Sequence, residues 1–591
     1  MTWTSTDIND QAKRGNTFIQ HYYRDQPSIH EIADGYRIAI VGAGPKGLYA
    51  LDSLCKQFSQ AAYSKKKIQV YWYNKDLAYG SGPNYRISQP EYLLINYCIA
   101  HIDAWEKCTQ RSDTQLDLLH WIQKYSCGEQ QVHASDYASR ALVGHYLQYA
   151  VMQVIQRKPA NLQLQLVPEQ VGDIRPAPKD LLVVHSPSMQ QELHQVLLAT
   201  GHCYRNAPYL DFGGRDQPAT YIAQAYPVEA LAKIPAGSRV GILGWGLTFI
   251  DAALQLSEGR GGRFDAQGNY QASGQEPILL PFSRHHLPIL TRGPVHGSPA
   301  YQLHYLDKNR IAKLDDIRQQ RKIDFNREIL PLLEEEVRFA YYSTFLQSRS
   351  ESVIASYLHN LSTESQFGWF SLLFSKIPKK GSLQASYIQH INTQIAEAEK
   401  GIAHSPLMAA AAIWQLLSPT FSRWYAEGGL TGISQAYFDQ QLFGAICRTS
   451  YGPPIGNMKK IRGLLQADII QTVGEGTVSV SYKPDRASYK LQDQQHQEEL
   501  DYLIDARIAR PNLQAHNSAF YQRLWQNGLI RPYENEGYRP GTAESLHPNL
   551  YAYGSNTEGI LHDNDSLSRG KNNILPSWLR HVATHINHHH T

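Results

Sequence analysis

The segment YRIAIVGAGPKGLYALDSL, residues 36–54, restricts the possible folds more than any other stretch of this chain. An apolar run predicts a strand, and Gly42, Gly44 and Gly47 follow it as GxGxxG before a helix-like pattern begins. The first glycine makes the bend, the second lets the backbone approach a pyrophosphate, and the third allows close helix–strand packing. The helix start would offer amide donors to phosphates. The alternative is an ordinary tight turn, but the context favours a dinucleotide-binding Rossmann unit.

The next predicted strand, KIQVYWYN at residues 67–74, ends in Asn74. In a Rossmann unit, this position usually carries an acid that binds the ribose hydroxyls. An amide also donates and accepts hydrogen bonds, so Asn74 stays a candidate for this contact.

A second strand–turn–helix pattern, SRVGILGWGLTFIDAALQL, occupies residues 238–256, with its strand predicted at residues 239–243. Gly244 and Gly246 form its turn, and Phe249 stands where a third glycine would be, so helix and strand must pack further apart there. Asp251 is either a functional acid or a structural carboxylate near the helix start. Two such patterns in one chain imply two bound dinucleotides.

Two further predicted strands end in glycine-containing turns. HQVLLATGHCYRN at residues 194–206 leads into Thr200 and Gly201, and HPNLYAYGSNTEGI at residues 547–560 leads into Gly554, Ser555 and Asn556. This order resembles the two-dinucleotide-binding flavoproteins, in which the first loop binds FAD and an inserted second domain binds NAD(P)H. In many of them the returning strand ends in Gly-Asp, with the Asp facing the ribitol; here Ser555 or Asn556 would replace that acid.

Four blocks narrow this resemblance: LAYGSGPNYRISQPEYLLIN (77–96), ASRALVGHYLQY (138–149), GWGLTFIDAALQLSEGRGGRF (244–264) and RTSYGPP (448–454). Together they are similar to the bacterial FAD-NAD(P)-binding family. That family includes flavin-dependent N-hydroxylating monooxygenases, among them enzymes that oxidise the amine of aspartate to nitrosuccinate. The resemblance implies that four residues lie close to the flavin, with an ordinary Gly/Pro loop as the alternative: Gly80, Gly82, Gln89 and Asn96. Arg140 and Tyr146 either support the phosphates or pack a helix.

The strand PILLPF at residues 277–282 is followed by Ser283 and Arg284. Its end should lie at the adenosine ribose of a dinucleotide on the second loop, where Arg and Ser suit a 2′-phosphate. NADPH is therefore predicted over NADH. The predicted cofactor-binding residues are Gly42, Gly44, Pro45, Lys46, Gly47, Asn74, Gly82, Gln89, Asn96, Thr200, Gly201, Gly244, Trp245, Gly246, Leu247, Thr248, Ser283, Arg284, Gly554, Ser555 and Asn556.

Residues 301–440 show apolar positions at helical spacing, for example at 324–348 and 382–402. They are predicted to form a helical insertion that serves as a substrate wall or lid, or alternatively a dimerisation or packing subdomain. Arg448, just after it, could hold a substrate carboxylate through a bidentate contact, or form a structural salt bridge.

The predicted fold is α/β, with two Rossmann-like dinucleotide-binding domains, one for FAD and one for NAD(P), and a helical insertion. The predicted parts are an N-terminal extension (1–35), the first part of the FAD-binding domain (36–215), the NAD(P)-binding domain (216–300), the helical insertion (301–440), a return segment of the second domain (441–504), and the C-terminal part of the FAD-binding domain with the tail (505–591).

Composition excludes several other classes. The 591 residues carry a net charge of only +3, spread along the chain, which does not favour nucleic-acid binding. No apolar stretch approaches the roughly 18 residues that a membrane span needs. The six cysteines show no CxxC pairing, and the N-terminus lacks an apolar signal core, so we expect a cytoplasmic protein with reduced thiols and no metal site.

The resemblance implies an FAD-dependent, NAD(P)H-driven monooxygenase acting on a small-molecule amine and O2 through a flavin C4a-hydroperoxide, with an amino acid such as aspartate as substrate. No catalytic residue is assigned, because the flavin performs the difficult chemistry. One alternative is another flavin reductase, dehydrogenase or oxidase. The other is a non-catalytic dinucleotide-binding protein, in which Asn74, Phe249 and Ser555 mark a decayed site. The sequence does not predict the oligomeric state.

Overall fold

The structure of the chain is a computed structural model that describes residues 2–26, 35–106, 111–127, 131–205, 209–212, 216–294, 301–474, 478–493 and 497–588. The chain divides into two compact units. Unit 1 consists of Met1–Tyr204, Tyr425–Glu427 and Arg510–Thr591, and unit 2 of Arg205–Trp424 and Gly428–Ala509. The main boundaries between the units thus fall after residues 204 and 509. The sequence predicts the corresponding domain ends at 215 and 504. The predicted ends at 215 and 300 and the end of the tail (589–591) lie outside the described residues.

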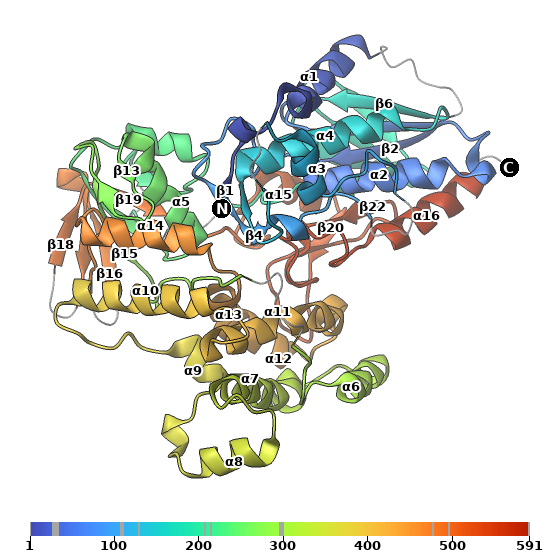
Figure 1. Cartoon of the computed structure of the whole chain (residues 1–591). Coiled ribbons are helices and arrows are strands. Elements are labelled where there is room, and N and C mark those ends of the chain that lie inside the picture. The colour runs from blue at the N-terminus through green and yellow to red at the C-terminus, as the bar shows by residue number, and fades with distance from the viewer. Residues whose placement is uncertain are drawn as a thin grey trace. The chain divides into compact units, whose positions relative to one another are not determined.

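Unit 1 contains both ends of the chain (Figure 1). Its helices are α1 (Asp10–Asp25), α2 (Pro45–Phe58), α3 (Leu118–Tyr125), α4 (Arg140–Gln156), α15 (Ala519–Gln526) and α16 (Leu575–His588). Its strands are β1 (Thr2–Trp3), β2 (Tyr36–Val41), β3 (Ile68–Tyr73), β4 (Leu94–Cys98), β5 (Tyr137–Ser139), β6 (Leu162–Val167), β7 (Asp173–Ala177), β8 (Leu181–His185), β9 (Gln190–Leu193), β10 (Gln195–Leu198), β20 (Ile530–Pro532), β21 (Ala543–Ser545) and β22 (Leu550–Ala552).

A five-stranded parallel sheet, in the order β22-β10-β2-β3-β6, forms the centre of unit 1. Every residue of β3 is buried, as expected for a parallel strand covered on both faces. The helices α2 and α16, from opposite ends of the chain, lie side by side (Figure 1). The first residues are part of this unit, because α1 packs along α4 and β1 pairs with β5.

Unit 2 is richer in helix. Its helices are α5 (Leu247–Gln255), α6 (Lys308–Gln320), α7 (Leu330–Phe345), α8 (Glu351–His359), α9 (Trp369–Phe374), α10 (Leu383–Lys400), α11 (Pro406–Tyr425, whose last residue belongs to unit 1), α12 (Gly432–Tyr437), α13 (Phe443–Ser450) and α14 (Ile455–Gln466). Its strands are β11 (Tyr221–Ile222), β12 (Arg239–Leu243), β13 (Arg263–Phe264), β14 (Tyr270–Gln271), β15 (Ile278–Phe282), β16 (Ser479–Lys483), β17 (Ser488–Gln492), β18 (Gln497–Leu500) and β19 (Tyr502–Asp505).

A parallel sheet in the order β11-β19-β12-β15 carries the second glycine turn of unit 2. The strand β19 comes from residues far along the chain, yet it pairs with β12 from Val240 to Leu243. The residues just before β19 form an antiparallel sheet, β16-β17-β18. The long helix α10 packs against α14 (Figure 1). Within the described parts of both units, no helix combines the length and the apolar character that crossing a membrane requires.

Candidate functional site

The first glycine turn joins β2 to α2 and has the crowding that its sequence predicts. Gly42 has φ +111°, and a Cβ there would lie 2.1 Å from the Ala199 carbonyl oxygen. A Cβ at Gly47 would lie 2.2 Å from the carbonyl oxygen of Gly42. At Gly44, the N-cap of α2, a Cβ would meet no atom of the described part of the chain within 4 Å, apart from its chain neighbours. The turn is therefore closed behind its first and third glycines and open at the second.

Pro45 and Lys46 form the first turn of α2, where backbone amides have no partner inside the helix. The Lys46 ammonium donates to the Ser568 carbonyl oxygen at 3.3 Å and lies 5.1 Å from the centre of the Tyr553 ring. Burial lowers the pKa of Lys46 to about 8, although the carboxylates of Asp565 and Asp563 act in the opposite direction. The helix start thus combines amide donors with a partly desolvated cation, which suits an anion.

The glycines of the 77–96 block lie against this turn. The Gly80 amide donates to the Ala43 carbonyl oxygen at 2.7 Å, and a Cβ on Gly82 would lie 3.1 Å from the Gly44 Cα. Gln89 is buried, and its Oε1 has no hydrogen-bond partner. Asn96 lies in β4, within the sheet β1-β5-β4.

Asn74, which is predicted to contact the ribose, uses its side-chain amide for local hydrogen bonds. Its Nδ2 donates to the Asp76 carbonyl oxygen at 2.8 Å and to Asp76 Oδ1 at 3.1 Å. Tyr146 packs a helix: its hydroxyl accepts from the Ala104 amide at 3.0 Å and donates to the Leu116 carbonyl oxygen at 2.9 Å. Of the two alternatives for Tyr146, the structure therefore favours packing.

The crossing and returning strands bring their glycine turns to the first loop, because β10 lies between β22 and β2. Gly201 is open: among the described residues, none beyond its chain neighbours has an atom within 4 Å of a Cβ placed there. A Cβ on Gly554, in contrast, would lie 3.1 Å from Lys46 Cγ. Thr200 Oγ1 lies 3.1 Å from the Tyr521 hydroxyl, to which Asn556 Nδ2 also donates at 2.8 Å. Residues more than 500 positions apart in sequence thus converge at one edge of the sheet.

Sequence reasoning missed two residues at this edge, Tyr521 and Asp565. Tyr521 on α15 links Thr200 to Asn556, and no pattern around it indicated this role. Asp565 Oδ1 lies 3.2 Å from His202 Nε2. The only signal for Asp565 was an acidic run, HDND, about ten residues after Gly554.

The second glycine turn, between β12 and α5, lies in unit 2. Gly244 has φ +127°, while Gly246 is open, with no atom within 4 Å of a Cβ. Trp245 stacks on Tyr387 of α10 with ring centres 5.4 Å apart. Leu247 and Thr248 begin α5, and Thr248 is buried.

The end of β15 lies next to this turn, because the Gly244 amide donates to the Phe282 carbonyl oxygen at 2.8 Å. Ser283 and the exposed Arg284 follow directly after this strand; their contact with an adenosine ribose stays a prediction. Asp251 is buried and accepts from the Tyr226 hydroxyl, which favours its structural role.

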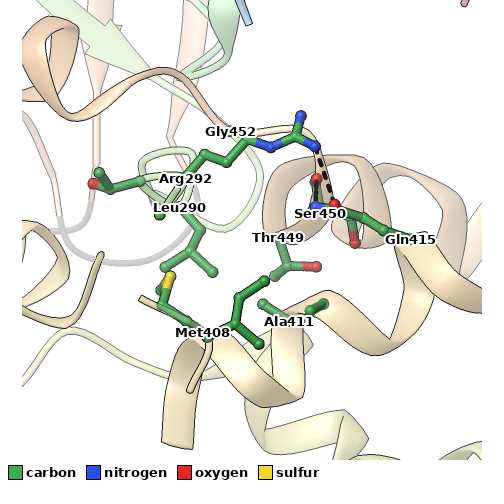
Figure 2. A pocket seen from close by; sticks show the side chains of 12 residues that line it. Leu290, Arg292, Met408, Ala411, Gln415, Thr449, Ser450 and Gly452 are labelled. Atoms are coloured by element: carbon green, nitrogen blue, oxygen red, sulfur yellow. Dashed lines mark hydrogen bonds between the residues drawn. The ribbon is translucent and has the colours of Figure 1, made fainter. Parts of the chain in front are cut away.

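A small pocket, partly open to solvent, lies among the helices of unit 2. Its walls are largely apolar, with Met408 and Ala411 of α11 on one side (Figure 2). Arg292 is its charged lining residue, and its Nη2 donates to Gln415 Oε1 at 3.0 Å (Figure 2). Thr449 and Ser450 of α13 contribute hydroxyls.

Arg448 directly precedes Thr449 and Ser450 on α13. Its carbonyl oxygen accepts a hydrogen bond from the amide of Leu290, a residue that also lines the pocket. Its Nη2 donates to the Leu373 carbonyl oxygen at 2.5 Å, and within the described residues it forms no ion pair. Burial lowers the pKa of Arg448 to about 10. Burial, reinforced by the charge of Arg448, also lowers the pKa of His390 to about 4. Because no carboxylate among the described residues pairs with Arg448, the structure does not favour a structural salt bridge as its role.

Comparison with known proteins identifies the cofactor class of the first domain. Residues 39–203 match a family described as FAD-NAD(P)-binding. This part of the chain is an FAD-NAD(P)-binding domain. The resemblance and the predicted cofactor class, FAD with a nicotinamide dinucleotide, are thereby confirmed. The domain contains the first glycine turn, the 77–96 block and the Ala-Thr-Gly segment; the second turn lies outside the matched residues.

Two curated relatives cover most of the chain. A nitrosuccinic acid synthase of Aspergillus oryzae is 24% identical over 588 residues, with 88% of each chain covered. An L-aspartate N-monooxygenase (nitrosuccinate-forming) of Streptomyces davaonensis is 25% identical over 608 residues, covering 89% of this chain and 93% of that enzyme. A solved structure, the FAD-bound cadaverine monooxygenase DfoA of Erwinia amylovora, is 12% identical with a TM-score of 0.44, covering 94% of this chain and 95% of that one.

Proposed function

We propose that the protein is an FAD-dependent, NAD(P)H-driven monooxygenase that hydroxylates the amine of a small amino acid of the aspartate type. The observation that carries this proposal is the occurrence of two open glycine turns in one chain. Each follows a parallel strand and opens a helix, and each leaves free space at its middle glycine, Gly44 or Gly246. The names of the two curated relatives supply the reaction and the substrate class.

The residues at the first turn fit FAD. Free space at Gly44 and Gly201 leaves room for a ligand beside the backbone, and the start of α2 offers amide donors with Lys46 close by. FAD, when bound, supplies hydride acceptance from NAD(P)H and the activation of O2. The chain's own task is to bind and orient the dinucleotide, with the predicted contacts from Pro45 to Gly82, Gln89 and Asn96 and from Gly554 to Asn556.

We further propose that both parallel sheets belong to Rossmann-like domains, with the helical region after residue 300 as an insertion into the second. Gly244 to Thr248 would hold the nicotinamide dinucleotide. Arg284 is exposed at the end of β15, where it could contact a 2′-phosphate, so NADPH is preferred to NADH. The cytoplasmic location stays a prediction.

The substrate proposal rests on two arginines of unit 2. A small amino acid of the aspartate type carries two carboxylates, and a guanidinium can bind each through paired hydrogen bonds. Arg292 lines the pocket, and Arg448 lies beside it on α13 without an acidic partner among the described residues. Apolar walls would exclude water and help to keep the substrate amine neutral, as attack on an activated oxygen requires.

The test begins with the absorption spectrum of the purified protein, followed by anaerobic addition of NADPH and then NADH. A flavin spectrum that bleaches faster with NADPH, followed by an aspartate product heavier by one or more oxygen atoms, supports the proposal. Bleaching with no oxygen in the product would instead identify another flavin oxidoreductase. A protein that takes up no FAD would be a non-catalytic binding protein.

The role of Arg448 is tested by Arg448→Lys, because lysine keeps the charge but loses the paired donors. We expect kcat/KM for the amino acid to fall by roughly 10- to 100-fold, the value of a charge-assisted hydrogen bond, with the rate of flavin reduction by NADPH unchanged. Arg462→Lys is the matched control, since Arg462 also donates to a backbone carbonyl oxygen, that of Gln267. An unchanged kcat/KM in Arg448→Lys would overturn this role.

A further inference from the structure

An acidic side chain lies close to the end of the returning strand in unit 1. Gly554 is followed by Ser555 and not by an acid. The loop after this turn packs back on it, because Asn564 Nδ2 donates to Thr557 Oγ1 at 2.7 Å. The next residue is Asp565, whose pKa is lowered in part by hydrogen bonding from Ser555. The other side of the same carboxylate faces His202, with Oδ1 3.2 Å from Nε2. Asp565 is thus held between the returning turn and the residue that follows the Ala-Thr-Gly segment.

The carboxylate of Asp565 is partly accessible. Its side chain keeps 48% of its area accessible, and that of His202 keeps 33%. Burial is the largest influence on the pKa of Asp565 and would raise it; the charge and hydrogen bond of His202, together with Arg510 and Ser555, outweigh burial and hold that pKa below its usual value. The side chain is therefore an ionised carboxylate that a ligand can reach.

Asp565 lies where the predicted FAD-binding turns converge. The charge of Asp565 also acts on Lys46, in the first turn of α2, so the acid is close to the first glycine turn. Gly201 and Gly44, both open, belong to the two segments that flank it. An ionised carboxylate can only accept hydrogen bonds, so its ligand must provide donors. In a dinucleotide, the donors closest to the phosphates are the hydroxyl groups of the sugar or ribitol.

We propose that Asp565, positioned by Ser555 and His202, accepts hydrogen bonds from the ribityl hydroxyls of FAD. This inference rests on the proposed function, since it requires that unit 1 bind FAD. Ser555 and His202 are positioning residues: the hydroxyl and the imidazole fix the carboxylate, and Asp565 alone contacts the cofactor. The acid therefore comes from a loop after the returning strand and not from the strand itself.

The experiment measures FAD affinity of the apoprotein by quenching of flavin fluorescence. Asp565→Ser is expected to weaken FAD binding by about 10- to 100-fold, the loss of a hydrogen bond to a charged group. Asp563→Asn is the matched control, because Asp563 also acts on the charge of Lys46 from the same loop. Similar losses in both variants would mean a general charge effect and would overturn the contact.

A second variant returns the acid to the strand. In Ser555→Asp/Asp565→Ser the carboxylate directly follows Gly554, and we expect FAD affinity to recover at least tenfold over Asp565→Ser alone. Thermal unfolding of each apoprotein separates binding from folding. Failure of the double variant to recover, with normal folding, would contradict the assignment.

A third measurement identifies which hydroxyls are bound. ADP carries the adenosine ribose but no ribitol, and it is used as a competitor of FAD. Equal ADP affinity in wild type and Asp565→Ser supports the ribityl assignment, whereas a parallel loss would move the contact to the ribose and overturn it. Wild-type protein that binds no FAD would refute the proposed function itself, whereas wild type and Asp565→Ser binding FAD equally well would refute only this inference.

Discussion

In the first turn, Gly47 is expected to contribute to folding stability and Gly44 to FAD binding, and single substitutions distinguish these two roles. A Cβ at Gly47 would lie 2.2 Å from a backbone oxygen, so Gly47→Ala should separate α2 from β2 and cost about 1–3 kcal/mol of folding free energy. A Cβ at Gly44 meets open space, so Gly44→Ala should cost at most about 1 kcal/mol, the difference between glycine and alanine at an N-cap. It should still weaken FAD binding, because its methyl group occupies the cradle.

Urea unfolding of the apoproteins and FAD titration measure the two effects. The predicted pattern is a stability loss in Gly47→Ala and an affinity loss without a matching stability loss in Gly44→Ala. Equal FAD affinity in Gly44→Ala and wild type would mean that the cofactor does not approach the middle glycine.

The pair His202–Asp565 makes stability depend on pH. Burial alone would lower the pKa of His202, but the Asp565 charge and hydrogen bond outweigh it and raise that pKa, with Glu558 adding to the effect and Arg510 opposing it. A raised folded pKa means that this stabilisation is complete below the ordinary value near 6.5 and is lost as pH rises through the folded pKa. Unfolding of apoprotein followed from pH 6 to 9 should show this loss in wild type, and His202→Gln should remove it. A curve of unchanged shape in His202→Gln would exclude the pair as its source.

Residue roles were predictable where they are local. The requirement for glycine at 42 and 47 follows from the turn itself, and both positions are as crowded as the motif predicts. The hydrogen-bond partners of Thr200 and Asn556 were not predictable, because Tyr521 reaches Thr200 from 321 positions away. A single sequence contains no signal for such a pairing.

At the scale of elements, α10 links the helical region to the second glycine turn within unit 2. Tyr387 of α10 stacks on Trp245, and its hydroxyl donates to the His286 carbonyl oxygen at 2.5 Å, just beyond Arg284. We predict that Tyr387→Leu, which loses both contacts, weakens NADPH binding several-fold and leaves FAD affinity unchanged. Tyr387→Phe keeps the stacking but loses the hydroxyl, so its NADPH affinity should lie between those of wild type and Tyr387→Leu.

Anaerobic reduction at increasing NADPH concentration measures this effect as a change in half-saturation. Tyr357→Leu, in the more distant helix α8, serves as the aromatic control. Identical half-saturation in Tyr387→Leu and wild type would show that α10 does not support the nicotinamide site.

Strands with continuous apolar runs were predictable as elements. The predicted strand at residues 239–243 matches β12, and the predicted strands 67–74 and 277–282 contain β3 and β15. Their partners were less predictable. β19 completes the sheet of β12 from more than 250 positions away, and the pairing is set by packing in unit 2 and not by any local pattern.

At the scale of the whole molecule, unit 1 is built from both ends of the chain. The buried ion pair between Arg569 Nη1 and Asp52 Oδ2, 2.6 Å apart, joins the C-terminal segment to α2. Arg569 Nη2 also donates to Ser53 Oγ at 2.7 Å. The sequence indicates that a late strand returns to the first domain, but not which side chains secure that return.

Breaking this pair should destabilise unit 1 selectively. Arg569→Met leaves the buried Asp52 with Lys56, 3.3 Å away, as its remaining ion-pair partner among the described residues. We therefore expect a loss of about 3 kcal/mol, the lower end of the cost of breaking a buried ion pair by removing one partner. In calorimetry, the transition that FAD shifts upward should move down by several degrees, because FAD stabilises only the unit that binds it. The transition of unit 2 should not move.

The double variant Asp52→Leu/Arg569→Met separates charge from packing. Replacing both members of a buried pair by apolar groups is often neutral, so the FAD-sensitive transition should return toward the wild-type temperature. If the double variant is as unstable as Arg569→Met, the hydrogen bonds of Arg569 with Ser53 and the Ala104 carbonyl oxygen, and not the charge of Asp52, hold the C-terminal segment. If both transitions shift together, the two units unfold as one, and the division of the chain into independent folding units is wrong.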